Sequence, residues 1–311
     1  MTAPALLIAR HSARFVLREK IVGLLTGLFI VLVLLSAWLG WEATATVNRI
    51  YLDTAAFLQG AGQPVPSNPV LEISPLSLMR NMVVYVALIG ALAAIVIGNQ
   101  LVTIDRKGGV VPLIASRPLT SGAYATGKMA ALLGLVLVLT GVAAVLAAGT
   151  LAMLPQSAPD LAAWARLAGF LGLSALYMLT FGLVGLGAAA IARTEGAGLL
   201  VPVTLWLALT FVLPAVTSNI LPTAALNPIS ALAPPPDSAF FHAAGWLLGP
   251  LSLADAYKIA AAGLLDFLPP GFVDRSALPP LATLGLAVGL AAAWSARALL
   301  RMDRTDGDFD V

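Results

Sequence analysis

The sequence contains no cysteine and only two histidines, and just 10% of its 311 residues are charged. Without cysteine, neither a disulfide framework nor a thiolate metal site can form. The two histidines, His11 and His242, are too few for a metal site built from imidazoles. The acidic residues show no paired-carboxylate or nucleophile–base spacing. We therefore expect no catalytic site, no bound metal and no cofactor in this chain.

What the sequence has in abundance is apolar side chains. They make up 59% of the residues, and the mean hydropathy is +0.94. Soluble domains carry roughly a quarter charged residues, so a chain of this composition would expose too much apolar surface to water. The sequence predicts an all-α polytopic membrane protein, with residues 1–311 forming a single transmembrane domain and membrane lipids surrounding it.

Six apolar segments approach or exceed the roughly 20 residues that a helix needs to cross the hydrocarbon core. They are 21–41, 81–102, 129–154, 164–192, 197–220 and 281–300. We expect a polar loop between the first span and about residue 78. Prolines interrupt the segment 221–279, in which we expect two short helices, 240–248 and 253–265, that are too short to cross the membrane.

Six spans place both termini on one side, and the positive-inside rule selects the cytoplasm. With the termini inside, 12 of the 17 basic residues lie in cytoplasmic segments, and 221–279 faces outward. Residues 1–20 have the composition of an amphipathic helix at the membrane surface, with cations facing lipid phosphates and water. These cations are Arg10, Arg14, Arg18 and Lys20. The apolar run that follows is too long for a signal peptide.

The segment 103–128 is a basic cytoplasmic connection between two spans. Gly108 and Gly109 are suited to ending the second span, and Arg117 before Pro118 is expected to stop any short helix between them. A short helix held between two spans can pass a partner's movement to both. The residues alone leave two interpretations open, a docking element or an ordinary loop that obeys the positive-inside rule.

The same segment contains an incomplete phosphate-binding motif. Gly122 to Lys128 spells GxxxxGK, but Met129 stands where a serine or threonine would bind magnesium, and no strand precedes Gly122. We interpret these residues as a junction between loop and helix, with Lys128 extending its ammonium group toward the membrane surface. None of the expected spans has an acidic or basic residue in its interior, which disfavours a proton-coupled carrier.

Two stretches resemble a known family. The pattern of an acidic and basic pair, two glycines, Ser-Arg-Pro-Leu and a later Gly-Lys resembles the cytoplasmic loop of ABC-2 type permeases. Pro118-Leu119 and Gly127-Lys128 match that family's pattern, whereas Asp105 replaces its usual glutamate and Ser121 an arginine. Residues 250–259 resemble a segment of NosY-like permeases, the membrane subunits associated with nitrous-oxide reductase maturation.

The resemblance implies a permease of the ABC-2, type V exporter-like fold in a bacterial inner membrane. A separate ABC ATPase would bind ATP and magnesium, and two copies of this chain would form a homodimer. The residues implied in coupling to the ATPase are Asp105, Arg106, Lys107, Gly108, Gly109, Arg117, Pro118, Leu119, Gly127 and Lys128, together with the basic N-terminal helix. Those implied in an outward gate or in docking a periplasmic accessory protein are Asp255, Tyr257 and Lys258.

The implied function is export, or the handing over of a substrate for metalloenzyme maturation, with no role for nucleic acid. An alternative is a membrane scaffold that anchors a periplasmic maturation factor and transports nothing.

Overall fold

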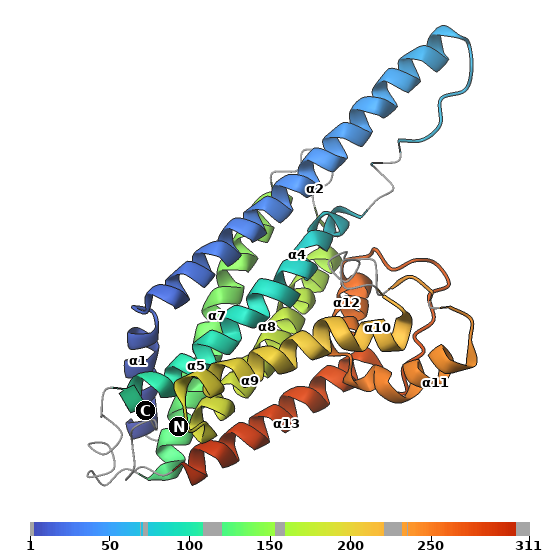
Figure 1. Ribbon diagram of the computed structural model, residues 1–311. Coiled ribbons are helices and arrows are strands. Elements are labelled where there is room, and N and C mark those ends of the chain that lie inside the picture. The colour runs from blue at the N-terminus through green and yellow to red at the C-terminus, as the bar shows by residue number, and fades with distance from the viewer. Residues whose placement is uncertain are drawn as a thin grey trace.

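The computed structural model describes residues 3–68, 70, 74–107, 120–152, 159–220, 232–234 and 236–302. Across these residues the regular secondary structure is entirely helical, as the sequence predicts (Figure 1). Six of the described helices are long and apolar enough to cross a membrane. They are α2 (Lys20–Gly60), the run of η1, α4, η2 and α5 (Pro75–Lys107), α7 (Ser121–Ala152), α8 (Leu161–Ile191), the run of α9, η3 and α10 (Glu195–Ser218), and α13 (Pro280–Arg301).

Helix α8 lies at the centre of the bundle and packs against α5 (Ala91–Lys107), α7, α9 (Glu195–Leu207) and α13. Its contact with α5 is made by glycines. A Cβ atom at Gly98 would clash with the backbone of Gly182, and one at Gly185 would clash with the backbone of Ile95. Small residues let two helix backbones approach closely, which is how helices associate in lipid. The α5–α8 pair is therefore the tightly packed core of the molecule.

Helix α2 continues well beyond the expected end of the first span. Residues 42–60 are helical, where the sequence interpretation placed a polar loop. The 41-residue helix is about 60 Å long at 1.5 Å per residue, about twice the hydrocarbon thickness. Figure 1 shows its second half extending past the other helices. The chain returns alongside it, since Tyr51 donates a hydrogen bond to the carbonyl of Pro66 at 3.0 Å.

The two short helices expected before the last span are present. They are α11 (Ala239–Leu248) and α12 (Leu253–Leu264), and α12 packs on α8 and α13. Ser238 caps α11 by accepting from the N–H of Phe241, which fixes where that helix begins. Figure 1 places both helices at the end of the bundle opposite α1 (Ala3–Val16). The fold thus has an inner end, defined as the end that carries α1, and an outer end.

Candidate functional site

At the inner end, Lys128 lies in the second turn of α7 and its side chain is only 1% exposed. Its Nζ lies 2.6 Å from Oδ2 of Asp105 on α5. The ammonium group also donates to Oγ of Ser12 on α1, at 2.9 Å, and to the carbonyl of Leu101. The interpretation of Lys128 as a side chain extended to the membrane surface is therefore wrong. It is a buried, fully paired cation.

Tyr124 completes this cluster, which we call the inner network: Ser12, Asp105, Tyr124 and Lys128. The Tyr124 hydroxyl donates to Oδ2 of Asp105 at 2.9 Å, and the Lys128 Nζ lies 5.2 Å from the centre of the Tyr124 ring. A buried ion pair is stable only when its remaining hydrogen-bonding capacity is satisfied, and here the ammonium group of Lys128 has an acceptor for each of its three N–H donors. The inner network joins α1, α5 and α7 at one point.

Gly127, next to Lys128, is required by close packing. A Cβ atom there would lie 2.8 Å from Cβ of Ile8 and 2.9 Å from the carbonyl oxygen of Ala5, both on α1. The two residues of the Gly-Lys pair therefore have separate roles. Gly127 allows α1 to pack closely against α7, and Lys128 holds α1 in that position through its hydrogen bond to Ser12. An apolar groove of about 420 Å³ between α1 and α5 borders the same Lys128–Asp105 pair.

The two basic residues at the end of α5 bind the turn between α8 and α9. Arg106 donates from Nη1 to the carbonyls of Ala189 and Ala192, at 3.1 Å and 2.6 Å, at the C-terminal end of α8. A cation is favourable there because the last carbonyls of a helix lack partners within it. Lys107 pairs with Glu195 at the start of α9, at 2.6 Å, but both side chains are about half exposed. The sequence interpretation assigned Arg106 and Lys107 to coupling and missed this link to the α8–α9 turn.

The helices reach further into the segment 103–128 than expected. Asp105, Arg106 and Lys107 belong to the last turn of α5, and α7 begins at Ser121. The remaining coupling residues lie outside the described residues, and their role stays a prediction. They are Gly108, Gly109, Arg117, Pro118 and Leu119.

Helix α1 has two different faces. Ala5, Ala9, Ser12 and Val16 are buried against the bundle, at the spacing of one helical face. Arg10 and Arg14 lie on the exposed surface together with the apolar side chains of Leu6, Leu7 and Phe15. Arg18 and Lys20 follow as exposed residues around the junction with α2. This mixture of exposed cations and exposed apolar groups fits a helix at a membrane surface.

At the outer end, all three residues expected at a gate or docking surface are buried in α12. Tyr257 is completely buried, its hydroxyl lies 2.8 Å from Oγ of Ser174, and its ring stacks on Tyr177 at 4.6 Å. Burial raises the pKa of Tyr257 above its ordinary value. The tyrosine anchors α12 to α8, and it is not available to a partner in this conformation.

Asp255 and Lys258 lie on the same helix, 8% and 1% exposed. Burial raises the pKa of Asp255, and the positive charge of Lys258 opposes that rise. Burial also lowers the pKa of Lys258, against the opposing effect of Asp255. Ser252 donates to Oδ2 of Asp255 at 2.7 Å. The pair therefore belongs to the interior of the outer end.

Comparison with protein families gives one assignment. The model of the family described as "ABC-2 family transporter protein" matches residues 6–306, nearly the whole chain. Among curated proteins, no relative matches significantly. With six apolar helices among its described residues, this chain belongs to the ABC-2 transporter family and is the multi-pass membrane permease subunit of an ABC transporter.

Proposed function

We propose that this chain is the transmembrane half of an exporter whose ATPase is a separate subunit that docks at the inner end. The GxxxxGK motif does not supply a nucleotide site here. Residues 121–128 form regular helix, and Gly127 and Lys128 are packed against α1. A phosphate cradle needs a run of free backbone N–H groups, whereas from Tyr124 onward, through Gly127 and Lys128, the N–H groups belong to the hydrogen-bonded turns of α7.

The inner network is the observation that carries this proposal. It binds α1, α5 and α7 together beside the point where the connection between α5 and α7 leaves and returns. A partner that pushes on this connection or on α1 therefore moves three helices as one body. Helix α5 transmits the movement to α8 through the glycine contacts, and α8 holds α12 at the outer end through Tyr257.

The proposed mechanism uses a homodimer. Helices α2 and α9–α10 are the least buried of the six spans, so they offer surface to a second copy. ATP binding closes the two ATPase subunits, their movement displaces the inner ends of the two permease halves, and a path opens between them. In a bacterial inner membrane, opening of this path toward the periplasm exports the substrate. The NosY-like resemblance at 250–259 suggests delivery of a substrate for metalloenzyme maturation to a periplasmic partner.

Purification of the tagged chain from its native membrane in mild detergent tests the proposal. We expect an ATP-hydrolysing subunit to copurify. Arg117→Glu reverses a charge on the cytoplasmic connection and should lower both recovery of that subunit and ATP-driven transport. Arg166→Glu is the matched control, because Arg166 is half exposed and pairs with Asp266 near the outer end. Recovery of a periplasmic protein with no ATPase would replace this proposal with the scaffold alternative.

A further inference from the structure

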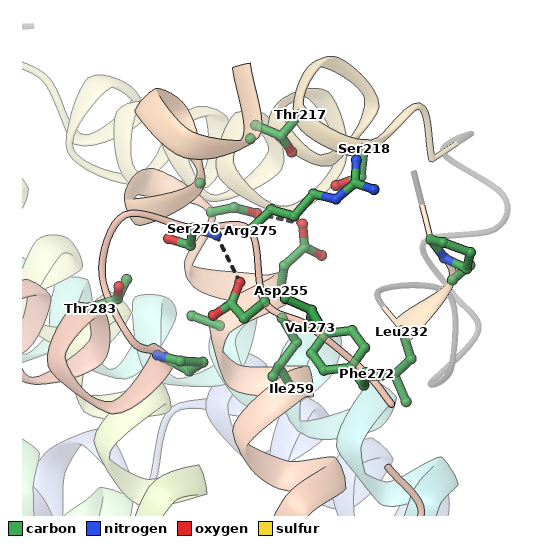
Figure 2. A pocket seen from close by; sticks show the side chains of 18 of the residues that line it. Thr217, Ser218, Leu232, Asp255, Ile259, Phe272, Val273, Arg275, Ser276 and Thr283 are labelled. Atoms are coloured by element: carbon green, nitrogen blue, oxygen red, sulfur yellow. Dashed lines mark hydrogen bonds between the residues drawn. The ribbon is translucent and has the colours of Figure 1, made fainter. Parts of the chain in front are cut away.

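The outer end contains a partly open cavity that the proposed transport cycle does not use. It has a volume of about 410 Å³ and lies between the end of α10 (Leu213–Ser218), α11, the start of α12, the segment 265–279 and the start of α13 (Figure 2). Its volume falls in the range of roughly 300–1,000 Å³ that is usual for small-molecule sites. Its walls include the apolar side chains of Leu232, Ile259 and Phe272.

Three polar atoms of residues that line this cavity are buried and have no hydrogen-bond partner among the described residues. They are Oδ1 of Asp255, Nη1 of Arg275 and Oγ1 of Thr283. Asp255 and Thr283 are more than nine-tenths buried. Figure 2 shows the three side chains arriving from different parts of the fold: α12, the segment 265–279 and α13. Buried polar groups are normally satisfied, so three orphaned groups around one space indicate that something else bonds to them.

The carboxylate of Asp255 is fixed through one oxygen, and its other oxygen has no hydrogen-bond partner among the described residues. Its Oδ2 accepts from Ser252 at 2.7 Å, which fixes the side chain and leaves Oδ1 as an acceptor. Asp274, the other acidic residue in the lining, is used differently. Its Oδ1 accepts the N–H of Ser276 at 3.0 Å, in a turn of its own segment. Of the two acidic residues in the lining, Asp255 is therefore the one with a fixed carboxylate and an oxygen available to accept from a ligand.

The chemistry of the lining restricts the ligand. Asp255 offers an unpaired carboxylate oxygen and Arg275 an unpaired guanidinium N–H group, whereas Oδ1 of Asp274 is already bonded within its own turn. Lys258 lies one turn further along α12. Among the described residues no group of three or more metal-ligating side chains exists, which disfavours a metal ion. An ammonium group supplies the donor that Asp255 lacks, and an anionic oxygen group supplies the acceptor that Arg275 lacks.

We propose that this cavity binds a small organic zwitterion. Its primary ammonium group bonds to Asp255 and Thr283, and its carboxylate or phosphate bonds to Arg275. The apolar walls pack against the carbon skeleton between or beside these groups. Two sources share this chemistry, a free amino acid on the outer side of the membrane and the phosphoethanolamine headgroup of a membrane lipid.

Binding to the full chain in lipid nanodiscs, with any copurifying subunits, tests this inference without reference to ATP. The soluble probes are L-leucine and O-phosphoethanolamine, measured calorimetrically in discs of phosphatidylcholine, whose quaternary ammonium has no N–H to donate. We expect saturable binding of at least one probe, weakened at least about tenfold in Asp255→Asn because a hydrogen bond to a charged group is lost. Asp274→Asn is the matched control, since its amide oxygen still accepts from Ser276, and its affinity should stay within about twofold of wild type.

Phosphatidylethanolamine discs distinguish the two sources. If the headgroup is the ligand, native mass spectrometry shows this lipid retained by the wild type and lost from Asp255→Asn. If a free amino acid is the ligand, L-leucine binds equally in both kinds of disc. Thr283→Val provides an independent variant that keeps the volume and removes one orphaned hydroxyl, and it should weaken binding severalfold. The inference is overturned if no probe and no lipid binds, or if binding is unchanged in both Asp255→Asn and Thr283→Val.

Discussion

Lys128 illustrates how one residue can change meaning between sequence and structure. A lysine near the start of an apolar helix ordinarily extends to the membrane surface, and nothing in its neighbours contradicts that expectation. What buries it is α1, which lies more than 100 residues earlier and supplies Ser12. The matching acceptor, Asp105, comes from a third helix. Sequence spacing identifies the residue, but it gives no indication of these partners.

Lys128→Met should destabilise the protein strongly. The change leaves the Asp105 carboxylate buried with Tyr124 as a donor but without its counter-charge. Removing one partner of a buried ion pair costs about 3–5 kcal/mol. We expect a clear drop in the unfolding temperature in detergent, measured by tryptophan fluorescence. The double variant Asp105→Asn with Lys128→Met should recover part of the loss, and a single variant as stable as wild type would show that the pair contributes nothing.

At the scale of elements, the α5–α8 contact is set by glycines and supplies a matched pair of variants within one helix. Gly185→Ala places a methyl group against the backbone of Ile95, whereas a Cβ at Gly172 meets nothing within 4 Å. We expect Gly185→Ala to lower folded yield and unfolding temperature. Gly172→Ala should be neutral or stabilising by up to about 1 kcal/mol, because alanine has a higher helix propensity than glycine. Size-exclusion profiles and thermal unfolding of the two variants side by side measure the difference, and equal behaviour would refute the packing role.

The ends of the helices were harder to predict than their existence. The six apolar segments could be recognised from the sequence because a chain crossing lipid must satisfy its own backbone hydrogen bonds and carry apolar side chains. The extension of α2 to Gly60 was missed because polar residues such as Glu42, Arg49 and Asp53 were interpreted as a loop. The useful signal was the absence of glycine and proline from residues 42–59, which permits the helix to continue.

At the scale of the whole molecule, the outer end shows the limit of prediction from sequence. The proline pattern predicted a short helix over 253–265 that includes Asp255, Tyr257 and Lys258, and the structure has these residues on α12. It gave no indication that α12 lies on α8, with Tyr257 stacked on Tyr177 eighty residues away. The cavity is also formed by segments distant in sequence, from Thr217 to Thr283. Such sites arise only when the bundle closes, and no local pattern encodes them.

The orientation of the bundle can be tested directly, because the chain contains no cysteine and each introduced cysteine is unique. Two exposed positions suit this test: Arg18, which follows α1, and Gln59, which lies near the far end of α2. Each is replaced by cysteine in a separate variant, Arg18→Cys and Gln59→Cys. With the termini inside, a membrane-impermeant maleimide should label Gln59→Cys in right-side-out spheroplasts and Arg18→Cys only after permeabilisation. The unmodified chain is the background control and should not react. Labelling of Arg18→Cys in sealed spheroplasts would place the inner network outside the cell, beyond the reach of a cytoplasmic ATPase, because α1 carries Ser12 of that network.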